Sequence, residues 1–290
     1  MNSLSQVVVN TFRPKTLSAS FVPVLVGSLL YPSNFQPVLM LSLLFTVICL
    51  QMGTNFINDA LDFTKGADNK NRIGPMRMVQ AGLLTTKQIY QLGLLLFATS
   101  LVTAIPLIEA GGSSFLILLF ISVVLGYCYT GGPIPLAYRG LGEVFVFLFF
   151  GIAATVSAIY LQIHTVPFMG WIAGAIVGLH SVVMIAVNNI RDMENDKLAQ
   201  KRTLAVRFGE RFAKTEIIFC ILSPYLLTLL WLNQGNYLAA FLPFLSLPLA
   251  LHLSKSIYQT PPSPIYNSYL AQGGLLHILF STLMVIGARV

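Results

Sequence analysis

Long apolar runs alternate with short polar stretches along the whole 290-residue chain. A helix that crosses a bilayer needs roughly 20 mostly apolar residues, and the chain divides into about nine runs of that kind. The pattern therefore predicts an all-α fold, a polytopic bundle of transmembrane helices. The expected spans are residues 16–32, 37–59, 86–108, 113–130, 143–163, 167–190, 215–233, 236–256 and 267–288.

The composition points to the same environment. Hydrophobic residues make up 56% of the chain and charged residues only 9%, with a mean hydropathy of +0.77. A soluble domain of this length carries more charge, so we expect a single integral-membrane domain over residues 1–290. The first dozen residues lack the basic start, apolar stretch and cleavage site of a signal peptide. We therefore expect no segment to be removed.

Basic residues gather on one side of the expected spans. Of the seventeen Lys and Arg residues, only Arg289 falls on the other side. The positive-inside rule then predicts a cytoplasmic N-terminus and an external C-terminus. The sequence pI of 9.4 arises from residues that flank spans without any nucleic-acid-binding motif, which excludes nucleic acid as an expected partner. The three cysteines lie in separate spans and are expected to be buried apolar residues.

Two connections on the predicted cytoplasmic side are long and polar, residues 59–85 and 191–214. The connections on the other side are only a few residues long. Long connections in a compact protein are usually functional or disordered. The Gly, Pro, Thr and apolar residues spaced along these two favour ordered caps over a cavity.

Each long connection begins with an acidic patch where an apolar run ends. Asn58 and Asp62 are four residues apart in the first patch, as are Asp192 and Asp196 in the second, so each pair projects from one face of a continuing helix. A carboxylate at a helix C-terminus is disfavoured by roughly 0.3–1 kcal/mol, which requires a compensating cation. Mg²⁺ takes one or two carboxylates and completes its shell with water and phosphate oxygens. Two such patches therefore predict a metal–diphosphate site.

Basic side chains near the patches are suited to the diphosphate oxygens that a metal leaves free. They are Lys65, Arg72, Arg77, Lys197, Lys201 and Arg207. The alternative interpretation is that all these charges form solvated helix ends with surface ion pairs, which contribute little to stability. Two patches at matching places in the chain favour the site over this alternative.

A faint internal repeat relates the two patches. A shift of about 134 residues superimposes three polar positions, placing Asn55 on Asn189, Asn58 on Asp192 and Asp62 on Asp196. We therefore expect two similar four-helix halves, residues 1–142 and 143–256, followed by a ninth helix in residues 257–290. Parallel repeats of this kind commonly hold a site between the halves, so the patches should face each other across the bundle.

Longer strings around the patches resemble a known family. Asn58-Asp59-x-x-Asp62, followed by Gly66-x-Asp68 and Arg72-Ile73-Gly74-Pro75-x-Arg77, resembles the first aspartate-rich motif of the UbiA-type intramembrane prenyltransferases. The second motif is matched by Asn188-Asn189-Ile190-Arg191-Asp192-x-x-x-Asp196, which continues through Lys201-x-Thr203-Leu204-x-Val206-Arg207-x-Gly209. The strings are most similar to the 1,4-dihydroxy-2-naphthoate polyprenyltransferases of menaquinone synthesis.

Two further strings extend the resemblance over roughly residues 13 to 212. They are Arg13-Pro14-Lys15-Thr16-Leu17 before the first span, and Tyr129-Thr130-Gly131-Gly132-Pro133 through Gly140-Leu141-Gly142-Glu143 after the fourth. One departure from the wider superfamily is Gly66, which stands where a third aspartate is often found. Asp68 is displaced from that position by two residues, which leaves open whether it contacts a metal directly.

The resemblance implies a Mg²⁺-dependent transfer of a polyprenyl chain from an all-trans polyprenyl diphosphate to 1,4-dihydroxy-2-naphthoate, with loss of CO₂ and diphosphate, giving demethylmenaquinol. The implied metal ligands are Asn58, Asp59, Asp62, Asp68, Asp192 and Asp196. The implied catalytic residues are Asp62, Asp192, Asp196, Arg72 and Lys201, and Arg191 joins the diphosphate-binding residues. The implied location is the bacterial plasma membrane, with the lipid bilayer and the two substrates as partners and no obligatory protein partner.

Residues that would bind the acceptor are less strongly indicated. Tyr129, Tyr138 and Arg139 flank a Gly-Pro-rich loop on the same predicted face, where they would either contact the aromatic acceptor or anchor the membrane interface. Two other functions remain open. One is the same chemistry with another acceptor, such as a hydroxybenzoate, a futalosine-type precursor, a tetrapyrrole or a sugar phosphate. The other is a cation-coupled transporter, which would be expected to place acids near the bilayer midplane rather than at helix ends.

Overall fold

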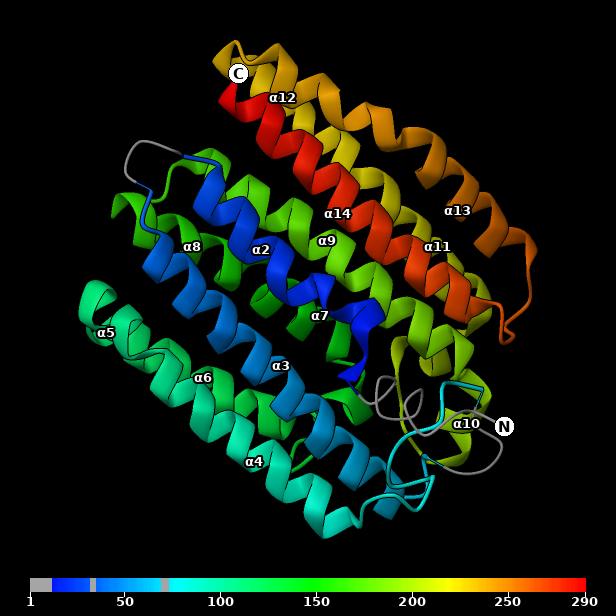
Figure 1. Cartoon of the computed structure of the whole chain (residues 1–290). Coiled ribbons are helices and arrows are strands. Elements are labelled where there is room, and N and C mark those ends of the chain that lie inside the picture. The colour runs from blue at the N-terminus through cyan, green and yellow to red at the C-terminus, as the bar shows by residue number, and fades with distance from the viewer. Residues whose placement is uncertain (1–11, 32–34, 69–72) are drawn as a thin grey trace.

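The computed structural model describes residues 12–31, 35–68 and 73–290. Every regular element in these ranges is helical, and the long helices lie side by side in one bundle (Figure 1). The predicted all-α bundle is confirmed.

Helical stretches lie at the place of each expected span. In the first part of the chain they are η1 (Pro14–Thr16), α2 (Ser18–Leu29), α3 (Pro37–Thr64), α4 (Thr86–Thr103), α5 (Ile105–Gly111), α6 (Ser113–Cys128) and η3 (Leu136–Arg139). In the second part they are α7 (Gly142–Val146), the π-helix η4 (Phe147–Ala153), α8 (Ala154–Ile163), α9 (Phe168–Arg191), α10 (Met193–Leu198), α11 (Leu204–Thr228), η5 (Leu229–Gln234), α12 (Tyr237–Phe241), η6 (Leu242–Ser246), α13 (Leu247–Gln259) and α14 (Tyr266–Arg289).

The expected number of nine spans is not confirmed. Within the described ranges, six helices are long and apolar enough to cross a membrane, or seven if α4 and α5 form one bent span. The bend between α4 and α5 is 42° and lies beside Pro106, because proline lacks the amide hydrogen that a helix interior needs. α2 and α6 are apolar but have only 12 and 16 residues. The hydropathy pattern measures the length of an apolar run, not the point at which its helix ends.

The helix α9 forms the centre of the second part of the bundle, where it packs against α2, η4, α11 and α14. Its Gly178 lies against Gly151 of η4, and a Cβ atom added at Gly178 would lie 2.9 Å from the carbonyl oxygen of Phe147. Small residues allow membrane helices to approach this closely. The two helices α3 and α9 both end at an acidic patch, and the equivalence of two halves remains a prediction.

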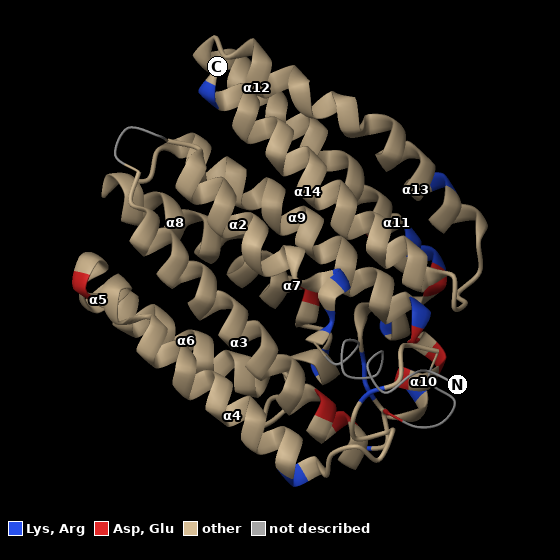
Figure 2. Ribbon diagram, in the orientation of Figure 1, with Lys and Arg blue, Asp and Glu red and all other residues tan. Residues whose placement is uncertain are grey.

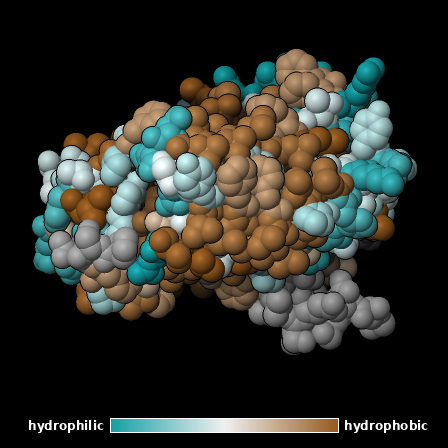
Figure 3. All heavy atoms as spheres, turned by 90° about the horizontal axis from the view of Figure 1, so that it is seen from above, coloured by the Kyte–Doolittle hydropathy of each residue, from teal (hydrophilic) through white to brown (hydrophobic). Residues whose placement is uncertain are grey.

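The surface matches a bilayer environment. Charged residues concentrate at the end of the bundle that holds α10, with few elsewhere (Figure 2). Seen from above, a broad hydrophobic surface covers the middle of the molecule and hydrophilic residues gather toward its ends (Figure 3). Large apolar side chains such as Phe120, Leu226 and Leu95 are more than 60% exposed. Exposed apolar surface of this extent is expected where lipid covers the protein.

Gly178→Leu should destabilise the fold. The larger side chain meets backbone atoms of η4 that cannot move aside cheaply, and overpacking of this kind costs about 1–3 kcal/mol. Thermal unfolding in detergent should show a lower midpoint than for the parent protein. Ala98→Leu, at an exposed site on α4, is the matched control and should leave the midpoint unchanged. Equal midpoints for both variants would contradict close packing at Gly178.

Candidate active site

The two acidic patches lie at the same end of the bundle, because α3 and α9 both end there (Figure 2). The loops that follow these helices are joined directly. The side-chain amide of Asn195, in α10, donates a 2.5 Å hydrogen bond to the carbonyl oxygen of Ala67, which follows α3. The segments after the two helices therefore form one cap.

Two arginines neutralise the first patch. Arg77 lies 2.8 Å from Asp59 and 2.6 Å from Asp68, and its guanidinium is buried with them. Arg13 lies 2.5 Å from the same oxygen of Asp59 and donates a 2.8 Å hydrogen bond to Asn58. The first patch is thus a dense cluster of opposite charges, held between α3, the loop after it and the segment before α2.

Lys201 connects the first patch to the second. Its ammonium nitrogen lies 3.5 Å from Asp196 and 4.0 Å from Asp62. Asp62 also accepts a 2.9 Å hydrogen bond from the Tyr138 hydroxyl and lies 3.7 Å from Arg77. One buried lysine therefore holds a carboxylate from each patch, although the two carboxylates are 134 residues apart in the chain.

Asp192 is held differently. Arg191 donates to both of its carboxylate oxygens, at 3.0 and 2.6 Å, and donates a third hydrogen bond of 2.8 Å to Asn267 of α14. A bidentate pair of this kind fixes orientation as well as charge. The second patch is therefore fastened to α14 as well as to the cap.

The surroundings fix the protonation of most of these groups. Burial favours neutral side chains, but Asp59 and Asp68 raise the pKa of Arg77, and Asp196 and Asp62 raise the pKa of Lys201, so both remain cationic. Burial and the neighbouring Asp62 carboxylate raise the pKa of the Tyr138 hydroxyl, which remains a hydrogen-bond donor.

Asp196 differs from the other groups of the site. Burial raises the pKa of its carboxyl to about 6, even though Lys201 acts in the opposite direction. This carboxyl is therefore the one poised to lose a proton when further positive charge arrives.

The donor set fits a hard divalent cation. Asp59 Oδ2 and Asp196 Oδ2 are buried and have no hydrogen-bond partner among the described residues. Within the same residues, no three His, Cys, Asp or Glu side chains form a metal-binding group. Mg²⁺ does not need three, because it commonly takes one or two carboxylates and fills its octahedron with water and phosphate oxygens. Asn58, Asp192 and Asp196 line one polar cavity, and metal binding by the residues named from the sequence stays a prediction.

A polar cavity opens between the patches. Seven of the residues singled out from the sequence line it: Asn58, Arg77, Tyr129, Arg191, Asp192, Asp196 and Lys201. Four other expected residues do not line the cavity. Asp59, Asp62 and Asp68 contact the lining residue Arg77. Tyr138 donates its hydrogen bond to Asp62. The structure thus brings most of the expected site together around one space.

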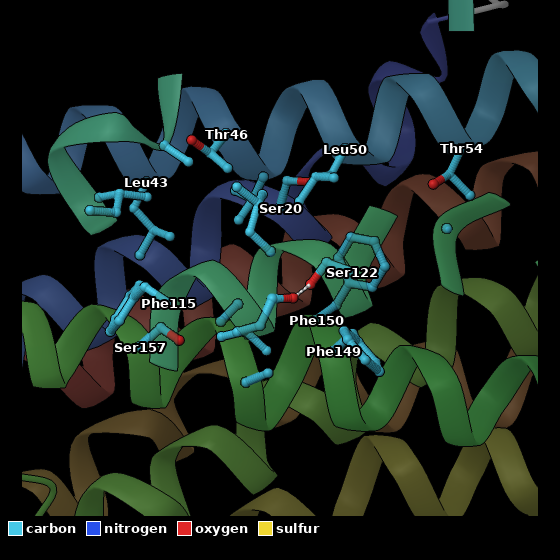
Figure 4. Close-up of a pocket in the computed structure, with 18 of the residues that line it drawn as sticks. Ser20, Leu43, Thr46, Leu50, Thr54, Phe115, Ser122, Phe149, Phe150 and Ser157 are labelled. Atoms are coloured by element: carbon cyan, nitrogen blue, oxygen red, sulfur yellow. Dashed lines mark hydrogen bonds between the residues drawn. The ribbon is translucent and has the colours of Figure 1, made fainter. Parts of the chain in front are cut away.

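An apolar cavity adjoins the polar one. Figure 4 shows aliphatic and aromatic side chains around it, together with a few hydroxyl groups. It extends between α3 and η4 and reaches α5. The two cavities share four lining residues, Ala19, Thr54, Phe145 and Phe150, so polar and apolar space meet directly.

Four of the expected residues are directed elsewhere. Lys65 donates to the carbonyl oxygen of Thr130 and lies 4.3 Å from the centre of the Tyr138 ring. Arg207 donates to the carbonyl oxygens of Arg202 and Arg139, so it joins two loops. Lys197 and Arg139 are exposed. Arg72 lies outside the described residues.

Arg13 is a site residue that the sequence does not predict as one. The Arg13-Pro14-Lys15 string indicates no role for it, because its partners Asn58 and Asp59 lie more than 40 residues away. The backbone of Arg13 is left-handed, with φ 52°. Residues before proline are normally extended, and a strained conformation beside a functional site often serves that site.

Comparison with known proteins agrees with this geometry. The model of the UbiA prenyltransferase family matches residues 20–271. The 1,4-dihydroxy-2-naphthoate octaprenyltransferase of Escherichia coli strain K12 is 33% identical over 216 residues, which are 72% of this chain and 70% of that protein. The enzyme of the same name from Haemophilus influenzae is 31% identical over 290 residues, covering 96% of this chain and 94% of that protein.

Solved structures share the fold. A UbiA homolog from Archaeoglobus fulgidus, bound to DMAPP and Mg²⁺, superimposes with a TM-score of 0.68 at 16% identity, covering 98% of this chain and 99% of that one. The apo structure of a UbiA homolog from Aeropyrum pernix K1 gives a TM-score of 0.66 at 14% identity, with 96% and 98% covered. The helical bundle, the two motif-bearing helices and the matched family model together show that this membrane protein is a prenyltransferase and belongs to the UbiA prenyltransferase family.

Proposed function

We propose that the protein transfers a polyprenyl chain from an all-trans polyprenyl diphosphate to 1,4-dihydroxy-2-naphthoate, with loss of CO₂ and diphosphate, giving demethylmenaquinol. The observation that carries the proposal is Lys201, which lies between Asp62 and Asp196 where a polar cavity meets an apolar one. The polar cavity suits a diphosphate and the apolar cavity suits its chain. The names of the curated relatives support the naphthoate as acceptor.

Three buried or half-buried cations act on the leaving group. Lys201, Arg77 and Arg13 line the polar cavity, where low dielectric strengthens their attraction for a diphosphate that gains charge as it departs. Mg²⁺, when bound by the two patches, would neutralise further charge on the same oxygens. Arg191 and Asp192 form one wall of this space, and Tyr138 keeps Asp62 in place through its hydrogen bond.

The proposed reaction is an electrophilic substitution on the aromatic ring of the acceptor. The carbon–oxygen bond of the prenyl diphosphate breaks with its electron pair on the diphosphate, and a π-electron pair of the ring forms the new carbon–carbon bond. The new bond forms at the ring carbon that bears the carboxylate, so loss of this group as CO₂ returns its bonding pair to the ring, which regains aromaticity without a proton transfer. Water would intercept the allylic cation, so the cap joined by Asn195 and Ala67 serves to exclude it.

The apolar cavity is the proposed place of the prenyl chain. Its lining residues come from α2, α3, α5, α6, η4 and α8, and the exposed apolar surface of the bundle allows the rest of a long chain to continue into lipid. The clustering of basic residues at the cap end supports a cytoplasmic N-terminus and cap, with the C-terminus outside, in the plasma membrane of a bacterium.

The acceptor is tested directly. Purified protein with Mg²⁺ and an all-trans polyprenyl diphosphate should convert 1,4-dihydroxy-2-naphthoate into a prenylated lipid, and mass spectrometry should show that the product lacks the carboxyl group. 4-Hydroxybenzoate in place of the naphthoate is the control. Prenylated hydroxybenzoate that retains its carboxyl, with no naphthoate product, would contradict the proposed acceptor.

Removal of one carboxylate from either patch should abolish most turnover. We expect Asp62→Ala and Asp196→Ala each to lower kcat by at least about a hundredfold, the usual loss for a charge-stabilising group. The double variant should be much less than additively worse, because the two groups act on one leaving group. Glu210→Ala removes a carboxylate that pairs with Lys214 at the surface and is the control, with near-normal kcat expected. Near-normal rates in either single variant would contradict a shared site.

Metal binding should weaken at acid pH. The metal-free Asp196 carboxyl has its pKa raised to about 6, and a metal binds the deprotonated form, so protons compete with the metal below that value. The dissociation constant of Mn²⁺, used in place of Mg²⁺ and measured by electron paramagnetic resonance, should rise about tenfold per pH unit below about pH 6 and stay flat above it. Asp196→Asn should bind more weakly and lose this dependence. A flat profile in the parent protein would remove Asp196 from the metal site.

A further inference from the structure

The buried carboxylate of Glu143 is bonded to a residue that lines the polar cavity but does not itself line it. Glu143, in the first turn of α7, is only 4% exposed. Its Oε1 accepts a 2.6 Å hydrogen bond from the side-chain amide of Asn189 on α9. Asn189 lines the cavity, whereas Glu143 does not. The hydrogen bond to Asn189 therefore connects the Glu143 carboxylate to the cavity.

This hydrogen bond decides what Asn189 presents to the cavity. A carboxylate oxygen only accepts hydrogen bonds, so the amide nitrogen of Asn189 faces Glu143 and the amide oxygen is directed away from it. No described residue donates a hydrogen bond to that oxygen in the structure. Asn189 thus offers the cavity an acceptor of fixed orientation, suited to a ligand that brings a hydroxyl group.

Two more polar groups of the same cavity lack partners. Asn55 Nδ2 and Ser181 Oγ are buried, line the cavity and have no hydrogen-bond partner among the described residues. Buried polar groups are normally paired, and leaving one unpaired costs free energy. Asn55 lies on α3 one turn before Asn58, and Ser181 lies on α9 about three turns before Asp192, so both precede the acidic patches along their helices.

Aromatic rings complete this part of the cavity. Tyr129 and Phe145 line it with their ring centres 5.6 Å apart, and Phe150 lies beside Phe145. Flat apolar walls with a few fixed polar groups are typical of sites for small aromatic ligands. A planar ring with hydroxyl substituents matches both the walls and the unpaired groups.

We propose that this region of Asn55, Ser181 and Asn189 binds the aromatic acceptor, and that Glu143 is a positioning residue that directs the Asn189 amide oxygen at the acceptor hydroxyl beside the carbon to be prenylated. The proposal rests on the proposed function and deepens it by naming the acceptor subsite. The hydroxyl stays protonated while it donates to Asn189. As the ring gives its electron pair to the allylic carbon, that hydroxyl becomes more positive, so the hydrogen bond strengthens along the reaction.

The proposal predicts a defect limited to the acceptor. Glu143→Leu should raise the KM for 1,4-dihydroxy-2-naphthoate by about tenfold, the effect of one lost hydrogen bond, and leave the KM for the prenyl diphosphate within about twofold. Glu143→Gln keeps an acceptor oxygen for Asn189 and should restore most of the acceptor affinity. Asn189→Leu should show the same acceptor defect, and the variant with both leucines should be no worse than Asn189→Leu alone.

A ligand change makes the test specific. An acceptor analogue with its hydroxyl groups methylated cannot donate to Asn189, so it should inhibit the parent protein about tenfold less well than the hydroxylated compound. Asn189→Leu should no longer distinguish the two compounds. Continued discrimination by Asn189→Leu would overturn the proposed contact.

Glu216→Leu is the matched control, since Glu216 is another partly buried acid in electrostatic range of Glu143 but does not bond to Asn189. An unchanged acceptor KM in Glu216→Leu supports the proposal, whereas an equal rise would assign the effect to disturbed packing and overturn it. If Glu143→Leu fails to fold, as judged by thermal unfolding in detergent, inhibition of Asn189→Leu by the methylated analogue tests the proposed contact instead. No turnover of the naphthoate by the parent protein would refute the proposed function, while turnover with an unchanged KM in Glu143→Leu and Asn189→Leu would refute only the acceptor subsite.

Discussion

The arrangement of this membrane protein depends on how carboxylates from two distant helices are neutralised in a buried place. Asp62 ends one long helix and Asp196 follows another, and Lys201 is held between them. Like charges at the negative ends of two helices repel each other and are costly to bury. Lys201 and Arg77 remove that cost, but only if both loops fold back over the helix ends. The cap, the polar cavity and the orientation of both helices therefore follow from one electrostatic requirement.

The same requirement explains why the cap carries so many interactions between segments that are remote in sequence. Arg13 crosses from the N-terminal segment to Asp59, Asn195 crosses from the second loop to Ala67, and Arg191 crosses to α14. Each is a charged or amide group that bonds to a buried or half-buried partner. Below the cap, close packing holds the bundle together with a few side-chain hydrogen bonds such as Thr46 to Thr103, and glycines on α9 and η4 let helices approach closely. The ion pairs and hydrogen bonds at the cap end are thus a separate source of stability from the close helix packing along the bundle.

The sequence predicted the class of fold and the residues of the two patches because both are encoded in local spacing. Apolar runs gave the helices, and the four-residue interval gave Asp62 and Asp196 a common face with their neighbours. Helix ends were harder, since α2 is shorter than its apolar run. The direction in which the basic side chains point could not be predicted from the sequence. Arg207 carries the expected charge but donates its hydrogen bonds to two backbone carbonyl oxygens. Arg13 has a left-handed backbone, which no spacing rule predicts.

The meeting of the two cavities at Thr54, Phe145 and Phe150 has a consequence for what happens after the bond is made. The products of a prenyl transfer differ sharply in solubility, one being a polyanion and the other a lipid-soluble prenylated compound. At this junction the polyanion faces the water beyond the cap. The lipid-soluble product faces the hydrocarbon between the helices. Departure of one does not require passage of the other, so partitioning between two phases draws the reaction forward and empties the enzyme for its next turnover.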